Sequence, residues 1–470
     1  MKIVLKRNRM NELNFDEFPE ISAKQWKQKI QFELQGADYN TSLNTTTPEG
    51  IIIKPFYTFE DLPKEDIKVP HKSSKGFKIA QRIYAANALK ANEKAIHAIQ
   101  NGATAIIFTL PKPDVDVAVL FGNIPDENIN IYLEIQFTAI DFTQQLANYI
   151  SQHQLKIYSI VDPIHKLATT GNWYQNVNTD FNFLKDYIPL TANFSGNIAV
   201  NGSLYADAGA NITQQLAYTI AHANEYLDFA YKNDLISQIK VTFQMAIGSN
   251  YFFEIAKIRA LRILIETVFS QYESNILHEI IAQPSTRNKT IFSSEMNMVR
   301  STTEMMSAII GEADVLCNSR YDDFYNKDNE FGERIARNQL LLLTEESDFN
   351  KVINPADGAY YIENITHQLS EKALALFKQI EAGGGFLKQL KSHTIQRKIK
   401  ENANWEQQQL DLQHSKIVGS NLFPDFTEKP KEFQLFPFLR KEKRKTLIEP
   451  ILPVRLTEKL EQERLKNGVS

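Results

Sequence analysis

The chain has 470 residues, of which 43% are hydrophobic and 23% are charged, so it can bury a sizeable core and wholesale disorder is excluded. Its 52 Lys and Arg residues are nearly balanced by 56 Asp and Glu residues, which argues against a nucleic-acid-binding protein. Cys317 is the single cysteine, which excludes an intrachain disulfide and any multi-cysteine metal site, and makes the reducing cytoplasm the natural compartment.

The N-terminus is charged and lacks the apolar segment of a secretory signal. No window of the sequence approaches the roughly 18 uninterrupted apolar residues of a membrane span. Met10 offers a second translation start, so we expect residues 1–9 to be a loosely held extension. The sequence therefore predicts a cytoplasmic protein without a membrane segment.

An arm is predicted ahead of the main domain, over residues 1–75. A helix is expected over residues 23–35, because Ser22 is a good N-cap and Gln25 completes a capping box with it. Residues 50–55 have the pattern of a short strand ended by proline, and the stretch up to residue 74 that of an extended connector.

From residue 77 the pattern alternates between strand-like and helix-like segments. Strands are predicted at 77–84, 105–110, 129–135, 156–161, 197–201, 239–246, 276–283 and 313–317. Helices are predicted at 92–100, 115–121, 141–154, 181–187, 212–231, 252–271, 294–310 and 331–344. Eight β–α units predict an α/β protein with a parallel sheet, and eight units close a (β/α)8 TIM barrel, here over residues 76–347. An open doubly wound sheet is the alternative, but the turn after Tyr84 lacks the glycine-rich sequence that such a fold often carries.

A helical segment is predicted after the barrel, over residues 348–418. It combines a strand-like run at 359–362 with an amphipathic helix at 367–380 and further helical stretches. Five prolines then interrupt residues 419–470, which are predicted to be an extended tail rich in Pro and Lys. The basic run 440–445 within this tail is interpreted as a solvated linker, with a phosphate-binding patch as the alternative.

Few residues with catalytic chemistry fall at the predicted C-terminal strand ends, where a barrel enzyme places its active site. The nine histidines form no closely spaced pair, and no P-loop, GxGxxG or GxSxG motif occurs. Asp162 and His165 could form an acid–base pair at one strand end, although no third residue is apparent to orient them. Cys317 is interpreted as a small buried hydrophobe rather than a nucleophile.

Several segments carry a recognisable family pattern, in one order along residues 18–402. They are GADY at 36–39, the run 50–58, EIAKIRALR at 254–262, RIARN at 334–338 with EES at 345–347, and VINPADGAYY at 352–361. Together these segments resemble the methylmalonyl-CoA mutase family. The resemblance independently implies the barrel. It also implies the family's reaction, the interconversion of methylmalonyl-CoA and succinyl-CoA by a radical rearrangement with adenosylcobalamin held over the barrel mouth.

Two departures from the family pattern imply that this chain is not catalytic. Where catalytic members carry Gly-Tyr-His after the fifth strand, this chain has a glycine followed by Ser203 and Leu204. Where the family has His-Ser-Gln-Thr-Ser-Gly after the seventh strand, Ile281 replaces the histidine and only Gln283 and Ser285 are retained. The resemblance thus implies no catalytic, cofactor-binding or metal-binding residue in this chain.

The Asp-x-His-x-x-Gly motif that ligates cobalt in the family's cobalamin domain is missing from the sequence, and we expect the chain to end about where that domain would begin. The resemblance therefore implies a small subunit in a heterodimer whose large catalytic partner holds adenosylcobalamin, with no nucleic-acid or membrane partner. Two alternatives stay open. One is the substrate-binding chain of a split acyl-CoA mutase, which should keep the histidine that Leu204 replaces. The other is an independent TIM-barrel enzyme that uses Asp162 and His165.

Overall fold

The chain divides into two compact units, Met1–Leu62 and Pro63–Ser470. The prediction for residues 1–9 falls outside the residues that are described. The computed structural model describes residues 21–62, 68–72, 76–125, 128–153, 155–272, 274–428, 431–440 and 444–467.

The first unit is short and buries few side chains. Its helix α1 (Ala23–Glu33) starts where predicted: the Ser22 side chain accepts from the Gln25 N–H at 3.3 Å, and the Gln25 side chain accepts from the Ser22 N–H at 2.8 Å, which confirms the capping box. Among residues 21–62 only Tyr39 and Ile51 are buried. The other elements of the unit are α2 (Tyr39–Leu43), the antiparallel pair β1 (Thr45–Thr46) and β2 (Ile52–Ile53), and the 3-10 turn η1 (Phe59–Asp61).

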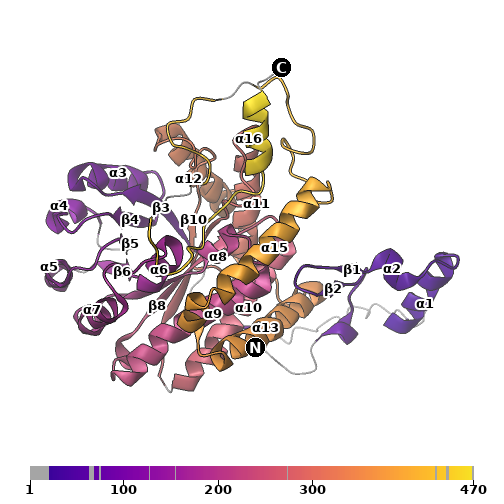
Figure 1. Ribbon diagram of the computed structural model, residues 1–470, viewed down its shortest axis with the longest axis horizontal. Helices are drawn as coiled ribbons and strands as arrows, with labels where there is room; N and C mark the ends of the chain where they lie inside the picture. Colours follow the sequence, from indigo (N-terminus) through magenta and orange to yellow (C-terminus); the bar gives the residue numbers. More distant parts are fainter. Residues whose placement is uncertain are drawn as a thin grey trace, which may run out of the picture. The chain divides into compact units, whose positions relative to one another are not determined.

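Eight parallel strands form the sheet of the second unit, in the order β6-β5-β4-β3-β10-β9-β8-β7, and confirm the predicted barrel (Figure 1). A parallel bridge between Tyr158 and Gly196 links β6 to the segment leading into β7 and brings the sheet close to full closure. Strands such as β4 and β8 are buried along their whole length because parallel strands are covered on both faces. The strands are β3 (Lys78–Tyr84), β4 (Ala105–Leu110), β5 (Asn130–Ile135), β6 (Lys156–Ile160), β7 (Ile198–Asn201), β8 (Val241–Ile247), β9 (His278–Pro284) and β10 (Val315–Cys317).

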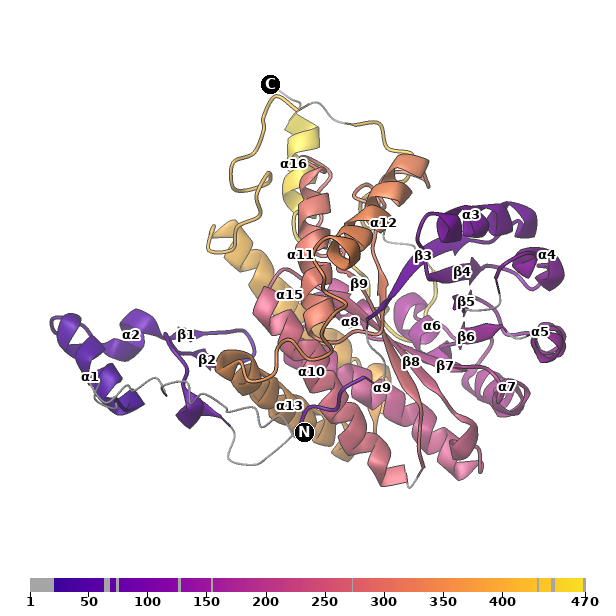
Figure 2. The same cartoon turned by 180° about the vertical axis from the view of Figure 1, so that it is seen from behind.

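Helices surround the sheet, as the two opposite views show (Figures 1 and 2). The eight predicted barrel helices are α3 (Ala88–Gln100), α4 (Val117–Phe121), α5 (Ile140–Gln152), α7 (Val177–Leu190), α9 (Ile212–Lys232), α10 (Tyr251–Phe269), α11 (Met296–Ile310) and α12 (Glu330–Glu345). Two short helices were not predicted, α6 (Pro163–Thr170) after β6 and α8 (Ser203–Asp207) after β7. The remaining 3-10 turns are η2 (Ile236–Gln238) and η3 (Ser270–Tyr272).

The predicted strand at 359–362 is wrong, because Tyr360 is the first residue of helix α13 (Tyr360–Ala382). This helix packs along α10 and α9 and buries Ile362, Ile365 and Leu369, so tertiary packing outweighs the local β-propensity of its aromatic start. Helices α14 (Phe386–Lys391), α15 (Thr394–Asp411) and α16 (Glu458–Asn467) follow. Among the residues described, no helix combines the length and the apolar character that a membrane crossing requires.

The barrel interior is a packed core. Side chains from seven of the eight strands form one buried cluster, and strands on opposite sides of a barrel can meet in this way only within its lumen. Tyr158 packs against the cluster from β6. The members are Ala80, Ala105, Ile107, Tyr132, Ile160, Ala199, Ile281, Val315 and Cys317.

Candidate functional site

The barrel mouth holds the residues that the sequence singled out, beginning with Ser203 and Leu204. Both belong to α8, which starts directly after β7, and both are buried, with exposures of 3% and 4%. The Ser203 hydroxyl has no hydrogen-bond partner among the described residues. The Leu204 side chain is apolar, so this position offers no hydrogen-bond donor at the mouth.

The residues of β9 and of the loop after it take structural roles. Ile281 is fully buried in the barrel core cluster. The Gln283 side-chain oxygen accepts a hydrogen bond from the Arg82 guanidinium at 3.2 Å. The Ser285 hydroxyl donates to the Asp207 carboxylate at 2.7 Å. The two polar residues that match the family pattern are thus held by other side chains of this chain.

Asp162 does not form the predicted side-chain pair with His165. Its carboxylate instead accepts from His222 Nε2 at 2.9 Å and from the Tyr226 hydroxyl at 2.7 Å. It also caps α6 by accepting from the backbone N–H of His165 at 2.8 Å, while the ring of that histidine lies against Thr169. The Asp162 carboxylate is therefore the N-cap of an unpredicted helix.

A buried chain of polar groups continues from Asp162. The second ring nitrogen of His222 hydrogen-bonds with the Tyr205 hydroxyl at 2.9 Å, and neither residue is exposed to solvent. Burial by itself would raise the pKa of Asp162, but the charge and hydrogen bond of His222, helped by Tyr226, hold it below its ordinary value. Burial raises the pKa of Tyr205 well above its usual range. The network fastens α9 to the mouth and has no solvent-accessible reacting group.

No sequence signal pointed to His222. It lies within α9, 60 residues from Asp162, and only the closed barrel brings the two together. The start of α6 can be recognised in the sequence, because Asp162 is a favourable N-cap residue and Pro163 follows it at the first helical position.

One half of the mouth, over β3, β4 and β10, contains an open pocket of about 190 Å³. The Arg82 guanidinium, which lines it, forms an ion pair with Glu134, and the Thr109 hydroxyl donates to the same carboxylate at 2.8 Å. Cys317 also lines this pocket, and burial raises the pKa of its thiol, which fits a poor nucleophile. The charge of Arg82 is thus already compensated within the chain.

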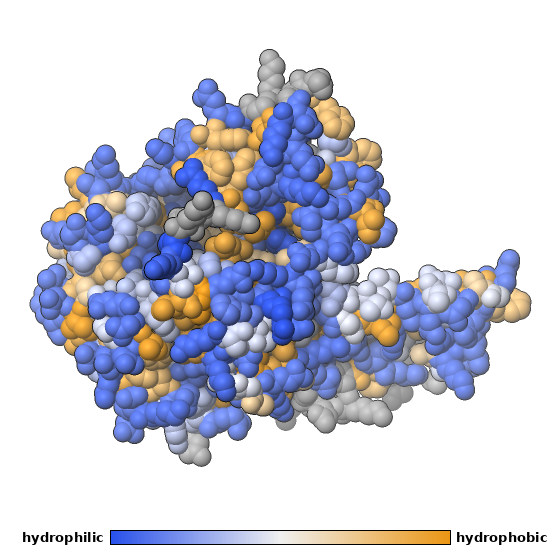
Figure 3. All heavy atoms as spheres, viewed as in Figure 1, coloured by the Kyte–Doolittle hydropathy of each residue, from blue (hydrophilic) through white to orange (hydrophobic). Residues whose placement is uncertain are grey.

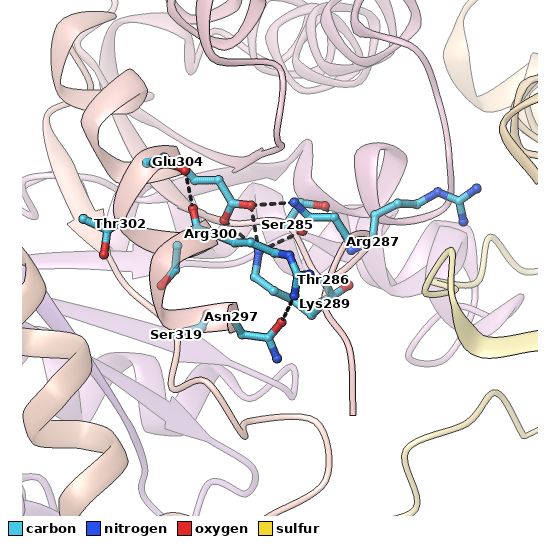
Figure 4. A network of polar contacts seen from close by, with 12 residues as sticks. Ser285, Thr286, Arg287, Lys289, Asn297, Arg300, Thr302, Glu304 and Ser319 are labelled. Carbon is cyan, nitrogen blue, oxygen red and sulfur yellow. Dashed lines mark hydrogen bonds and ion pairs between the residues drawn. The ribbon is translucent and has the colours of Figure 1, made fainter. Parts of the chain in front are cut away.

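The loop after β9, in the other half of the mouth, is held by a polar network (Figure 4). Lys289 forms a buried ion pair with Glu304 at 2.7 Å, and the Arg300 guanidinium donates to the Asn297 side chain at 2.7 Å. The Arg287 guanidinium pairs with Glu406 and donates to the backbone carbonyl of Val454 at 2.7 Å. This loop is therefore bonded to α11, to α15 and to the tail.

Tail residues 444–454, called the strap below, cover this half of the mouth. The N–H of Leu447 donates to the Gly171 carbonyl at 2.9 Å, that of Ile451 to Ala168 at 2.8 Å, and that of Val454 to Asp207 at 3.0 Å. These carbonyls follow β6 and β7, and Figure 1 shows the gold tail running beside α6. The basic run 440–445 contributes Arg444, which donates to the Thr170 carbonyl at 3.0 Å.

In the lower lumen, the Glu279 carboxyl group near the start of β9 lies beside two tyrosines. Tyr132 donates a hydrogen bond to Glu279, and the Tyr132 and Tyr158 rings stack at 4.6 Å between centroids. Burial, with the nearby charge of Asp314, raises the pKa of Glu279 to about 8. The raised pKa favours the protonated form of Glu279 in the folded protein.

One group with metal-ligand spacing occurs within the described part of the chain: His71, Glu312 and Asp357 place ligand atoms within 4.8 Å of one another. The two ring nitrogens of His71 lie 2.8 Å from Glu312 and 3.2 Å from Asp357. Arg259 also pairs with Asp357 at 2.7 Å. The positive charge of the Arg259 guanidinium beside Asp357 disfavours the binding of a divalent cation, so the cluster is best described as an ion-pair network.

The family model that matches this chain and the similar proteins of known name agree on one family. The family model described as methylmalonyl-CoA mutase matches residues 114–463. A methylmalonyl-CoA mutase small subunit of Porphyromonas gingivalis is 32% identical over 450 residues, which cover 88% of this chain and 71% of the relative. A methylmalonyl-CoA mutase small subunit of Streptomyces virginiae is 26% identical, and the match covers 90% of this chain and 73% of that one. A large subunit of Porphyromonas gingivalis is 30% identical over 235 residues, 48% of this chain and 33% of that one.

The first five relatives are covered by this chain over 64% to 73% of their length. Among solved structures, the dihydropteroate synthase of Yersinia pestis aligns over 65% of this chain and 99% of that one, with 11% identity and a TM-score of 0.30. A likeness this weak carries no argument about function.

Proposed function

Because this chain belongs to the methylmalonyl-CoA mutase family, we propose that it is the small, non-catalytic subunit of a cytoplasmic methylmalonyl-CoA mutase. Its partner would be a large subunit that binds the acyl-CoA and adenosylcobalamin and interconverts methylmalonyl-CoA and succinyl-CoA. Relatives named small and large subunits support a two-subunit arrangement.

The observation that carries this proposal is the buried Leu204 at the barrel mouth. A reaction that shifts charge onto a thioester carbonyl needs a hydrogen-bond donor aimed at that oxygen, and losing such a donor costs on the order of 3 kcal/mol. Leu204 supplies no donor, and Ile281 is buried in the core. A substrate-binding chain of a split mutase would need a histidine where Leu204 stands, so this alternative is not favoured.

The residues of this chain do not fit the family's ligands. A CoA thioester held within a barrel needs an open lumen, whereas nine buried side chains occupy this one. The sequence also lacks the Asp-x-His-x-x-Gly motif of the cobalamin domain. We therefore assign the radical chemistry and its cofactor to the large subunit and derive no step through either group here.

We assign the contact with the large subunit to the N-terminal arm, residues 1–75. Within its described part, Trp26, Phe32 and Phe59 are 53%, 79% and 74% exposed, and α1 buries no residue. Hydrophobic residues are visible on the surface of this unit in Figure 3. Exposed apolar side chains gathered on a short arm are typical of a protein–protein interface.

Co-expression with the large subunit of the same organism tests this function. We expect the two chains to co-purify, this chain alone to show no mutase activity, and the complex to be active. Phe32→Asp should weaken assembly, whereas Lys24→Asp, at an exposed position of the same helix, is the matched control and should not. Turnover by the isolated chain, or assembly unaffected by removal of residues 1–62, would contradict the proposal.

A further inference from the structure

We propose that the strap is a built-in lid of the barrel mouth, which opens as one unit while the barrel stays folded. This inference goes beyond the proposed function, because it concerns a conformational change and requires neither activity nor a partner. Two sets of contacts support it: those that hold the residues on either side of the strap, and those that bind the strap to the barrel mouth.

Both flanks of the strap are pinned close together. Arg455, which is only 6% exposed, forms an ion pair with Glu461 and lies 4.6 Å over the ring of Phe324. The same guanidinium donates to the Pro437 carbonyl at 3.2 Å, and the Leu439 N–H donates to Glu458 at 2.7 Å. The described residues on the two sides of the strap, 437–439 and 455–461, therefore contact one another.

The tip of the strap is docked next to α6 and against α15. The Gly171 carbonyl accepts from the N–H groups of both Leu447 and Ile448, at 2.9 and 3.2 Å. The Asn172 side chain accepts from the Leu447 N–H and donates to the Lys445 carbonyl, both at 3.1 Å. Polar docking of the tip thus falls on Gly171 and Asn172 and, through Glu449, on His393, Gln396 and Lys400 at the start of α15.

Gly171 is required for this close approach. Its φ is +77°, and a Cβ at this position would lie 2.6 Å from the Ile448 carbonyl oxygen and 2.7 Å from the Thr446 Cβ. Gly358 has nearly the same φ, +78°, but no atom within 4 Å of its own added Cβ. Valine at either site strains the backbone equally, and only valine at 171 displaces the strap.

The docked strap has the features of a locally opening segment. It has no regular secondary structure, Leu447 is 68% exposed, and burial is concentrated in Ile448 and Ile451. The barrel beneath is tied by seven strand ladders, by one bridge between the segments of β6 and β7, and by a shared core. Segments with few buried contacts open with a much lower free energy than the whole domain, so the lid can open without the barrel.

Opening would uncover a defined part of the mouth. The strap lies on the elements that follow β6 and β7, above the buried network of Asp162, His222 and Tyr205. Any molecule that docks against this half of the mouth must displace the strap first. Closure thus decides whether this half is accessible.

Amide hydrogen exchange of the full chain under native conditions tests the lid. We expect Leu447, Ile448 and Ile451 to exchange at one common rate, at least about 10-fold slower than free amides and at least about 100-fold faster than amides of β4 and β8. Gly171→Val should abolish the strap's protection and leave β4 and β8 unchanged, while Gly358→Val keeps it. Asn172→Ala removes docking bonds without backbone strain and should speed strap exchange several-fold.

Three results would overturn the lid. The strap amides could be unprotected in the wild type, they could exchange at the same slow rate as β4 and β8, or Gly358→Val could release them as fully as Gly171→Val. None of these results concerns assembly or turnover, so the proposed function would stand or fall separately.

Discussion

The two halves of the barrel mouth differ in how their polar groups are satisfied. Over β6, β7 and β9, the groups are bonded to the chain's own strap, as in the contact of Arg287 with the Val454 carbonyl. Over β3, β4 and β10 the mouth stays open, but Arg82 is paired with Glu134. This mouth therefore differs from a substrate site both in its replaced residues and in the internal bonding of those that remain.

The largest expected effect comes from the base of the strap. Arg455→Ala leaves the buried Glu461 without its partner, and breaking a buried pair in this way costs about 3–5 kcal/mol. Urea unfolding followed by circular dichroism measures the loss. Lys459→Ala breaks the exposed pair with Asp411 and serves as the control, with an expected loss below about 1 kcal/mol. Equal losses in the two variants would mean that the strap is not anchored through Arg455.

The Glu279 carboxyl group in the lower lumen predicts a pH dependence of the free energy of unfolding. The folded pKa of Glu279, about 8, lies above its unfolded value, so its contribution is fully present below pH 4.5 and is lost as the pH rises towards 8. Relative to Glu279→Gln, the free energy of unfolding of the wild type should fall by about 1.4 kcal/mol per pH unit, or about 2–3 kcal/mol between pH 5 and 7. A difference that does not change with pH would show that Glu279 is ionised in the folded state.

The stability of the protein should be less sensitive to a substitution in the open half of the mouth. Glu134→Gln removes the partner of Arg82, but the two side chains are 25% and 35% exposed, so solvent screens the unpaired charge. We expect a loss of about 1 kcal/mol in thermal unfolding, and a partial recovery when sulfate is added, because an anion can then reach the guanidinium through the pocket. A loss as large as that of Arg455→Ala would mean that the two halves do not differ.

The smallest expected effect is a test of the replaced residues. The double variant Ser203→Tyr, Leu204→His restores the family's residue types at the mouth. It should still not bind succinyl-CoA, because Ile107, Tyr132 and Ile281 continue to fill the lumen. Saturable binding by this variant, measured by equilibrium dialysis beside the wild type, would show that the two side chains alone had closed the site.

The barrel was predictable from sequence because each strand is a short apolar run followed by a helix signal. Every predicted strand from 77–84 to 313–317 overlaps an observed one. The strand at 359–362 failed because its aromatic residues pack as the first turn of α13. A local sequence pattern does not show against which surface a later helix packs, so it could not indicate that these residues begin α13.

The site was less predictable because its contacts join residues far apart in the chain. Asp162 was found, but its partner His222 was not, since nothing in α9 marks that histidine as different from a core residue. The position of the strap could not be predicted either. The prolines of the tail predicted an extended segment, but they gave no indication that Gly171 would accept hydrogen bonds from it.

The most direct test of the central claim is a calorimetric titration of the purified chain with succinyl-CoA and, separately, with adenosylcobalamin, using the large subunit as the positive control. We expect no saturable heat from this chain with either ligand and one-site binding by the large subunit. One-site binding of succinyl-CoA by this chain alone would contradict a filled lumen and, with it, the non-catalytic role.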